Sequence, residues 1–153
     1  MLRLADLHRG AMAADMALGA TWASDLEALH RAALAEPGRI VLVAEVDGEV
    51  VGMAHVAPSG AANAPHRAEV QRVAVASESR GTGVGRELME ALEQIALARG
   101  LTLLWLTTHD GSKAGPFYEA VGYTKLGVMP DYSLRPDGQL WPAALYFKRL
   151  APG

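Results

Sequence analysis

The glycine-rich stretch RGTGVGR, residues 80 to 86, has the residue types and the spacing needed to bind an anion. Its three glycines alternate with other residues, between a β-branched run and a run of helix-forming residues. Glycines let successive backbone N–H groups turn toward one anion, and the start of a helix adds about half a positive charge. Arg80 and Arg86 flank the turn, and each is able to neutralise a phosphate oxygen. The stretch therefore predicts a site for a pyrophosphate.

Two other phosphate-binding motifs do not match this spacing. A Walker loop requires G-x-x-x-x-G-K-[ST], but Gly85 is followed by Arg86 and Glu87. A dinucleotide fingerprint requires G-x-G-x-x-G, and its third glycine, counted from Gly81, would fall at Arg86. The pattern that remains is R-x-x-G-x-G, from Arg80 to Gly85.

Hydrophobic periodicity and turn residues predict the elements that position this stretch. Ser24 and Glu27 form a capping box that begins a helix, and Asp47-Gly48 joins two β-branched runs as a hairpin. The other predicted elements are a first strand at Leu2–Ala5, a helical segment to about Leu18, strands at 68–76, 101–108, 123–129 and 145–150, a helix from Val84 that Gly100 stops, and a short helix before Gly122. This mixture of early hairpins and later strand–helix alternation predicts a mixed α/β or α+β fold.

Composition excludes several classes of function. The 153 residues predict one domain, residues 1–153, and the formal net charge of −3 argues against nucleic acid or an acidic membrane as a partner. Charged residues interrupt every apolar run near the start, so we expect neither a signal peptide nor a membrane span. The absence of cysteine fits a cytoplasmic protein, and the five histidines show no metal-ligand spacing.

The stretch VAVASESRGTGVGRELM resembles the acetyl-CoA signature of the GNAT superfamily of N-acetyltransferases, which is [Q/R]-x-x-G-x-[G/A] after a β-strand. The resemblance extends from about Val41 to Leu150 and includes the segment FYEAVGY. It implies a central mixed, mostly antiparallel sheet of about six to seven strands, flanked by about four helices. In that fold the fourth and fifth strands, here 68–76 and 101–107, splay apart and admit the pantetheine arm.

Acetyl-CoA is the co-substrate that this resemblance implies, without a metal. By resemblance, backbone groups of Val73 and Val75 bind the pantetheine and the acetyl carbonyl, and the amides of residues 81 to 86 bind the pyrophosphate. The complete set that we assign to the cofactor is Val73, Ala74, Val75, Arg80, Gly81, Thr82, Gly83, Val84, Gly85, Arg86 and Ser112.

Acetyl transfer requires a neutral amine, a polarised thioester and a proton for the departing thiolate. The family commonly places a tyrosine beside the sulfur, and the matching residue is Tyr118, with core packing as the alternative role. Proton transfer from a tyrosine (pKa ~10) to a thiolate (pKa ~8.5) is uphill by roughly 2 kcal/mol, so a hydrogen bond would serve equally. Similar proteins often carry an aspartate base where this chain has Thr107. Glu69 is our candidate, and His109 or Asp110 could substitute.

The sequence says less about the acceptor than about the cofactor. We assign Trp22, His55, Trp105, His109 and Tyr132 to its site, although each of them could instead pack in the core. The resemblance implies transfer to a primary amine of a small molecule, and the most similar subgroup includes tabtoxin-resistance acetyltransferases. The alternatives are a protein or peptide N-acetyltransferase and a non-catalytic acyl-CoA-binding module. The resemblance is compatible with a homodimer, and it leaves the acceptor, the base and the acyl length open.

Overall fold

The computed structural model describes residues 26–135 and 137–151. The elements in chain order are α2 (Leu26–Ala35), β1 (Ile40–Val46), β2 (Glu49–Pro58), β3 (Arg67–Val75), the short 3-10 helix η2 (Ser77–Ser79), α3 (Val84–Ala98), β4 (Leu103–His109), α4 (Ala114–Ala120), β5 (Thr124–Leu134) and β6 (Leu140–Arg149). The predicted strand at Leu2–Ala5, the helical segment after it and the Ser24 cap lie outside the described residues.

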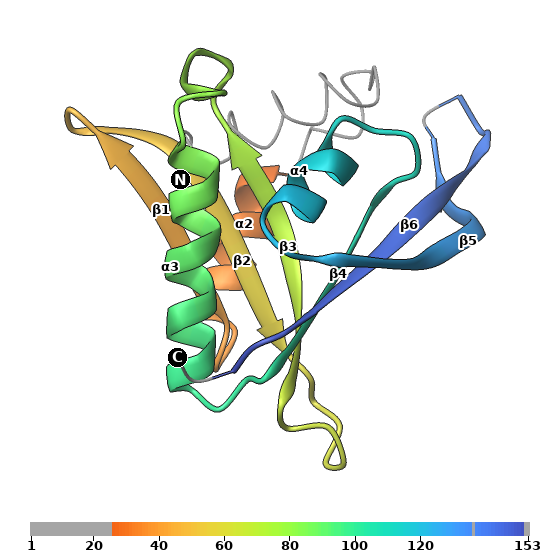
Figure 1. The fold of residues 1–153 in the computed structure, drawn as a ribbon, viewed down its shortest axis with the longest axis horizontal. Coiled ribbons are helices and arrows are strands. Elements are labelled where there is room, and N and C mark those ends of the chain that lie inside the picture. The colour runs from red at the N-terminus through yellow and green to blue at the C-terminus, as the bar shows by residue number, and fades with distance from the viewer. Residues whose placement is uncertain (1–25, 136, 152–153) are drawn as a thin grey trace.

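The six described strands form one sheet in the order β1-β2-β3-β4-β6-β5. Each neighbouring pair is antiparallel except β3 and β4, which are parallel. Helix α3 lies on one face of β1 to β3 and α2 on the other, while α4 lies on the same side as α3 (Figure 1). The predicted mixed, mostly antiparallel sheet is therefore confirmed.

The two halves of the sheet separate between β3 and β4. These strands pair only at their first residues, from Arg67 opposite Leu103 to Glu69 opposite Trp105. Beyond that point they diverge, and α4 lies near the opening (Figure 1). The predicted splay is confirmed, and its vertex is the Glu69–Trp105 pair.

The turn chemistry of the sequence is also confirmed. Asp47 and Gly48 have φ values of 51° and 80°, the left-handed backbone of the two-residue hairpin turn that joins β1 to β2. The last hairpin is longer than predicted, because β5 and β6 continue to Leu134 and from Leu140. Their added residues are mostly exposed, so burial periodicity did not reveal them.

The main core lies between the sheet and helices α3 and α4. Its largest fully buried side chains include Met89 and Leu92 of α3, with Leu104 and Leu106 of β4. Among the residues that the structure describes, no helix is both long and apolar enough to span a membrane.

Candidate active site

The glycine turn leads directly into the N-terminus of α3. Gly81 and Gly83 have φ values of 76° and 97°, a left-handed conformation that other residues rarely adopt. Gly83 caps α3 without a side-chain hydrogen bond, and the first intrahelical bond runs from Glu87 N to Gly83 O at 3.1 Å. The N–H groups of residues 84 to 86 therefore have no acceptor within the helix and are available for an anion.

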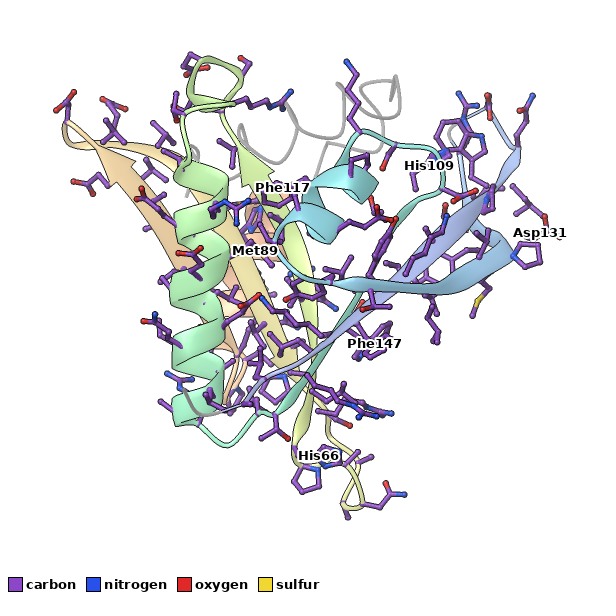
Figure 2. The ribbon with its side chains drawn as sticks, viewed as in Figure 1. His66, Met89, His109, Phe117, Asp131 and Phe147 are labelled. Carbon is purple, nitrogen blue, oxygen red and sulfur yellow. The ribbon has the colours of Figure 1, made fainter. Side chains whose placement is uncertain are left out.

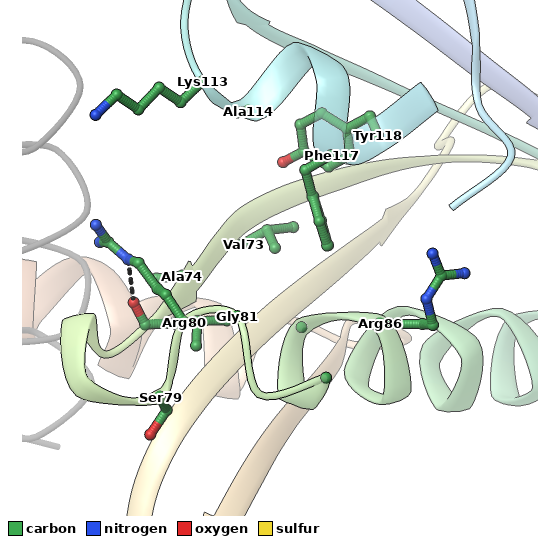
Figure 3. A pocket seen from close by; sticks show the side chains of 13 residues that line it. Val73, Ala74, Ser79, Arg80, Gly81, Arg86, Lys113, Ala114, Phe117 and Tyr118 are labelled. Atoms are coloured by element: carbon green, nitrogen blue, oxygen red, sulfur yellow. Dashed lines mark hydrogen bonds between the residues drawn. The ribbon is translucent and has the colours of Figure 1, made fainter. Parts of the chain in front are cut away.

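The third glycine is required for a different reason. A Cβ atom on Gly85 would lie 3.3 Å from Cε2 of Phe117 and 3.5 Å from Cγ2 of Val75. Phe117 extends from α4 toward the first turn of α3 (Figures 2 and 3). Only a residue without a side chain lets this ring approach the helix without displacement.

A cavity of about 430 Å³ lies between the glycine turn, the end of β3 and the start of α4. It is lined by the predicted cofactor residues Val73, Ala74, Val75, Arg80, Gly81, Gly83, Gly85 and Arg86, with Ser79, Lys113, Ala114, Phe117 and Tyr118 (Figure 3). Three predicted residues, Thr82, Val84 and Ser112, do not line it. The Thr82 hydroxyl donates to Ser79 O at 2.6 Å, and the Ser112 hydroxyl lies 3.2 Å from that of Thr108.

Three cations surround this cavity. Arg80 donates from Nε to Val75 O at 3.1 Å, and Arg86 donates from Nη2 to Ala120 O at 3.2 Å. Each bond fixes the side chain and leaves further N–H groups of the guanidinium for a phosphate. Lys113, which we did not predict, faces the glycine turn from the start of α4 (Figure 3). Its only signal in the sequence is a cation directly before the segment AGPFY.

Tyr118 lies on α4 at the inner wall of the cavity, 7% exposed. Its ring contacts those of Phe117, Tyr123 and Tyr146, with centroids 5.4 to 6.0 Å apart. Gly115 makes room for this cluster, because a Cβ atom there would lie 2.8 Å from the Tyr146 hydroxyl oxygen. Tyr118 is thus both a core ring and a wall of the cavity, so the two roles considered from the sequence are compatible.

The opposite face of the sheet carries the candidate base. Ala68, Val70 and Leu104 belong to the core under α3, so alternation directs Glu69 and Trp105 to the other face. The Glu69 carboxylate accepts a hydrogen bond from Gln71 Nε2 at 2.7 Å. A second cavity of about 480 Å³ lies on this face, lined by Arg67, Leu103, Trp105, Leu126, Phe147 and Arg149. The two cavities lie on opposite faces of the sheet, and of the vertex pair Trp105 lines the second cavity but Glu69 does not.

The predicted acceptor residues do not all gather there. His55 is fully buried on β2, where its ring packs against that of His30 at 5.1 Å, and it lines neither cavity. Tyr132 is exposed, and its hydroxyl accepts from Thr107 at 3.4 Å. His109 lies at the end of β4, with Nδ1 2.7 Å from Asp110 O and its ring against that of Trp141. Trp22 lies outside the described residues.

Asp110, an alternative base, is engaged elsewhere. Lys125 Nζ lies 2.9 Å from its Oδ1, and this ion pair connects the end of β4 to β5. The pKa of Lys125 is raised, chiefly by this hydrogen bond. The Asp110 carboxylate is therefore paired with a cation, whereas the Glu69 carboxylate accepts its hydrogen bond from the uncharged Gln71.

The first cavity fits the diphosphate and pantetheine of a coenzyme A thioester. The helix N-terminus and the cations Arg80, Arg86 and Lys113 suit the diphosphate, and Val73, Val75 and Tyr118 line the same cavity. Within the described residues, no group of three histidine, aspartate or glutamate side chains is placed to hold a metal ion.

A splayed sheet with an anion-binding helix N-terminus at the opening defines the class of acyl-CoA-dependent acyltransferases. The model of the Acetyltransferase (GNAT) family matches residues 5–123, and the chain belongs to this family.

Three known proteins illustrate the relationship. The chain is 47% identical over 74 residues to N-alpha-acetyltransferase 80 of Mus musculus, a match that covers 48% of this chain and 22% of the mouse protein. The chain thus spans less than half the length of the curated relatives it matches. A ribosomal-protein-alanine N-acetyltransferase from Brucella melitensis is 28% identical with a TM-score of 0.80, covering 96% of this chain and 92% of that one. A putative acetyltransferase from Salmonella typhimurium, solved with its cofactor acetyl-CoA, is 20% identical with a TM-score of 0.78, covering 99% and 89% of the two chains.

Proposed function

We propose that this chain transfers the acetyl group of acetyl-CoA to a primary amine of a small molecule. The observation that carries the proposal is the arrangement at the vertex of the splay. The cavity with the anion-binding turn lies on one face, and Glu69, Trp105 and a second cavity lie on the other. The second cavity, about 480 Å³, is within the range of small-molecule sites.

In the proposed reaction the amine approaches from the face of Glu69 and attacks the carbonyl carbon of the thioester. The new C–N bond forms as the C–S bond breaks, and the sulfur leaves as a thiolate. Tyr118 donates a proton or a hydrogen bond to that thiolate, because it lies at the inner wall of the first cavity. Glu69, directly or through a water, takes the proton that the attacking nitrogen loses.

The test of the tyrosine is the pair Tyr118→Phe and Tyr123→Phe. Both changes remove one buried phenol hydroxyl from the same aromatic cluster, but Tyr123 does not line the cavity. We expect Tyr118→Phe to lower kcat by roughly a hundredfold, with KM for acetyl-CoA nearly unchanged. Tyr123→Phe should keep kcat near that of the wild type. Equal rates for the two variants would remove Tyr118 from the reaction.

A second candidate acceptor is the N-terminal amine of a protein or peptide. The names of two similar proteins favour it. The mouse protein is named an N-alpha-acetyltransferase, and the Brucella protein is named a ribosomal-protein-alanine N-acetyltransferase. An α-amine has a pKa near ~8 and costs about 1 kcal/mol to deprotonate at neutral pH, against roughly 4 kcal/mol for a lysine-type amine. A site with one weak base therefore suits α-amines.

A panel of acceptors separates these candidates. CoA release is measured with small primary amines and with peptides that carry a free or a blocked N-terminus. A higher kcat/KM for small amines supports the proposal, whereas turnover confined to peptides with a free N-terminus supports the second candidate. Tight acetyl-CoA binding without turnover of any acceptor would leave only the non-catalytic module.

A further inference from the structure

Strand β3 contains a β-bulge beside the first cavity. Gln71 pairs with His55 and Ala74 pairs with Met53, so Arg72 and Val73 together face the single residue between those partners. Arg72 has a φ of 52°. A left-handed backbone costs a non-glycine residue about 1 to 2 kcal/mol and persists only where surrounding contacts enforce it.

The bulge determines which side chains reach the cofactor. Before it, Ala68 and Val70 pack in the core under α3; after it, Val73 and Val75 take that face and line the cavity. Ala74 packs with Met53 in a separate cluster. Without the extra residue, every side chain after position 71 would point to the opposite face.

A partly buried hydrogen bond holds Arg72 on the far side of the strand. Its Nη1 lies 3.3 Å from Nδ1 of His55, which is fully buried and packs edge to face against His30 of α2. Arginine has no acceptor, so the guanidinium is the donor in this contact and Nδ1 of His55 is the acceptor. A charged imidazole would repel the guanidinium instead.

Neighbouring side chains complete this anchor. Gln71 accepts a hydrogen bond from Arg39 Nη1 at 2.9 Å and donates one to Glu69 at 2.7 Å. Burial and the like charge of Arg39 lower the pKa of Arg72, and the carboxylates of Glu36 and Glu69 partly oppose this effect. Arg72 of the bulge and Gln71 directly before it therefore both have hydrogen-bonded side chains.

We infer that Arg72 and His55 are positioning residues, which fix the β-bulge and thereby the backbone of Val73 and Val75 at the acetyl end of the cavity. This inference rests on the proposal that the acetyl group binds there. Neither residue needs to contact the cofactor. We expect substitution of either residue to disturb mainly the binding of the acetyl group. The binding of the diphosphate should change less, because the glycine turn is held to the end of β3 by Arg80 and to α4 by Arg86.

Substitutions at Arg72 test the inference, and glycine is chosen so that the left-handed backbone at this position remains available. Arg72→Gly keeps the left-handed backbone accessible but removes the guanidinium, and Arg72→Lys keeps a donor and a charge. We expect Arg72→Gly to lower kcat/KM by about ten- to a hundredfold, and Arg72→Lys to restore part of the loss. Arg99→Ala, an exposed change at the C-terminal end of α3 and away from both cavities, should have little effect.

The second readout compares affinities for acetyl-CoA and CoA by calorimetry. Arg72→Gly should weaken acetyl-CoA binding more than CoA binding, whereas a general loss of structure would weaken both equally. If Arg72→Gly fails to fold, the pair His55→Asn and His55→Leu replaces it. Asparagine presents an oxygen where Nδ1 lies and should retain activity, while leucine should lose it.

The outcomes separate this inference from the proposed function. Wild-type kcat/KM and unchanged discrimination of acetyl-CoA from CoA in Arg72→Gly would overturn the inference, as would equal activity of the two His55 variants. A wild-type protein that turns over no acceptor would instead remove the proposed function.

Discussion

Replacing Gly83 by alanine tests the anion site at its most constrained residue. Gly83 has a φ of 97° and nothing within 4 Å of the place a Cβ atom would take, so the penalty is backbone strain alone. We expect about 1 to 2 kcal/mol. For a protein of this size that lowers Tm by roughly 2 to 8 °C.

The effect on the ligand should be larger than the effect on the fold. A shift of the backbone at Gly83 turns the N–H groups that begin α3 away from the diphosphate, and a hydrogen bond to a charged group is worth about 1.5 to 3 kcal/mol. Loss of one such bond raises Kd for acetyl-CoA by roughly ten- to 150-fold. At a concentration 100 times the wild-type Kd, stabilisation by the ligand falls from about 2.7 to about 1.4 kcal/mol or less.

The assay is thermal unfolding with and without acetyl-CoA, followed by calorimetric titration. Gly48→Ala is the matched control, because Gly48 has a φ of 80°, nothing within 4 Å, and a place in the β1–β2 hairpin away from the cavity. Both variants should lose similar stability, but only Gly83→Ala should lose ligand stabilisation. Full ligand stabilisation in Gly83→Ala would refute the assignment of this turn to the diphosphate.

Three further predictions use other contacts. Lys113→Ala should raise KM for acetyl-CoA about three- to tenfold in steady-state assays at low salt. The control is Lys125→Ala, which should leave KM unchanged because Lys125 pairs with Asp110. Equal KM values for the two variants would exclude Lys113 from phosphate binding. Lys148 Nζ lies 2.6 Å from a carboxylate oxygen of Glu93 and 2.7 Å from Val121 O. Lys148→Met should therefore lower the free energy of unfolding, measured in urea, by about 2 to 3 kcal/mol. Adding Glu93→Leu should recover part of this lost stability, because it removes the carboxylate left without its cation. Burial, followed by the charge of Arg72, lowers the pKa of His30 below 6.5. The unfolded chain then binds the proton more readily than the folded chain. The contribution of His30 to the free energy of unfolding should therefore be complete above pH 7 and decrease as the pH falls below about 6.5. His30→Leu should make the free energy of unfolding less dependent on pH in this range.

The conformation of the glycine turn could be predicted from the sequence because its requirements are local. Left-handed backbone at Gly81 and Gly83 and the start of α3 depend on consecutive residues, so their spacing is visible in one dimension. The Asp47-Gly48 hairpin is local in the same sense. By contrast Lys113 reaches the cavity only because α4 packs beside the splay, and no spacing relates it to Gly83.

The surroundings of His55 could not be predicted from the sequence for the same reason. Alternation along β2 places its side chain on the face of α2, but the sequence does not say whether that face is a cleft or a packed layer. Packing against His30 and the hydrogen bond from Arg72 made it buried structure. The β-bulge that changes the face of Val73 likewise depends on the register between β2 and β3.

The sequence by itself thus determined the kind of fold, the anion-binding turn and the family to which they point, since these follow from propensity, periodicity and short motifs. The tertiary structure decided where the sheet splays, and that Glu69 and Trp105 form its vertex. It also decided that Arg72 anchors to a buried histidine. These features depend on strand register and side-chain packing between residues distant in the chain, and the order of residues along one strand does not contain them.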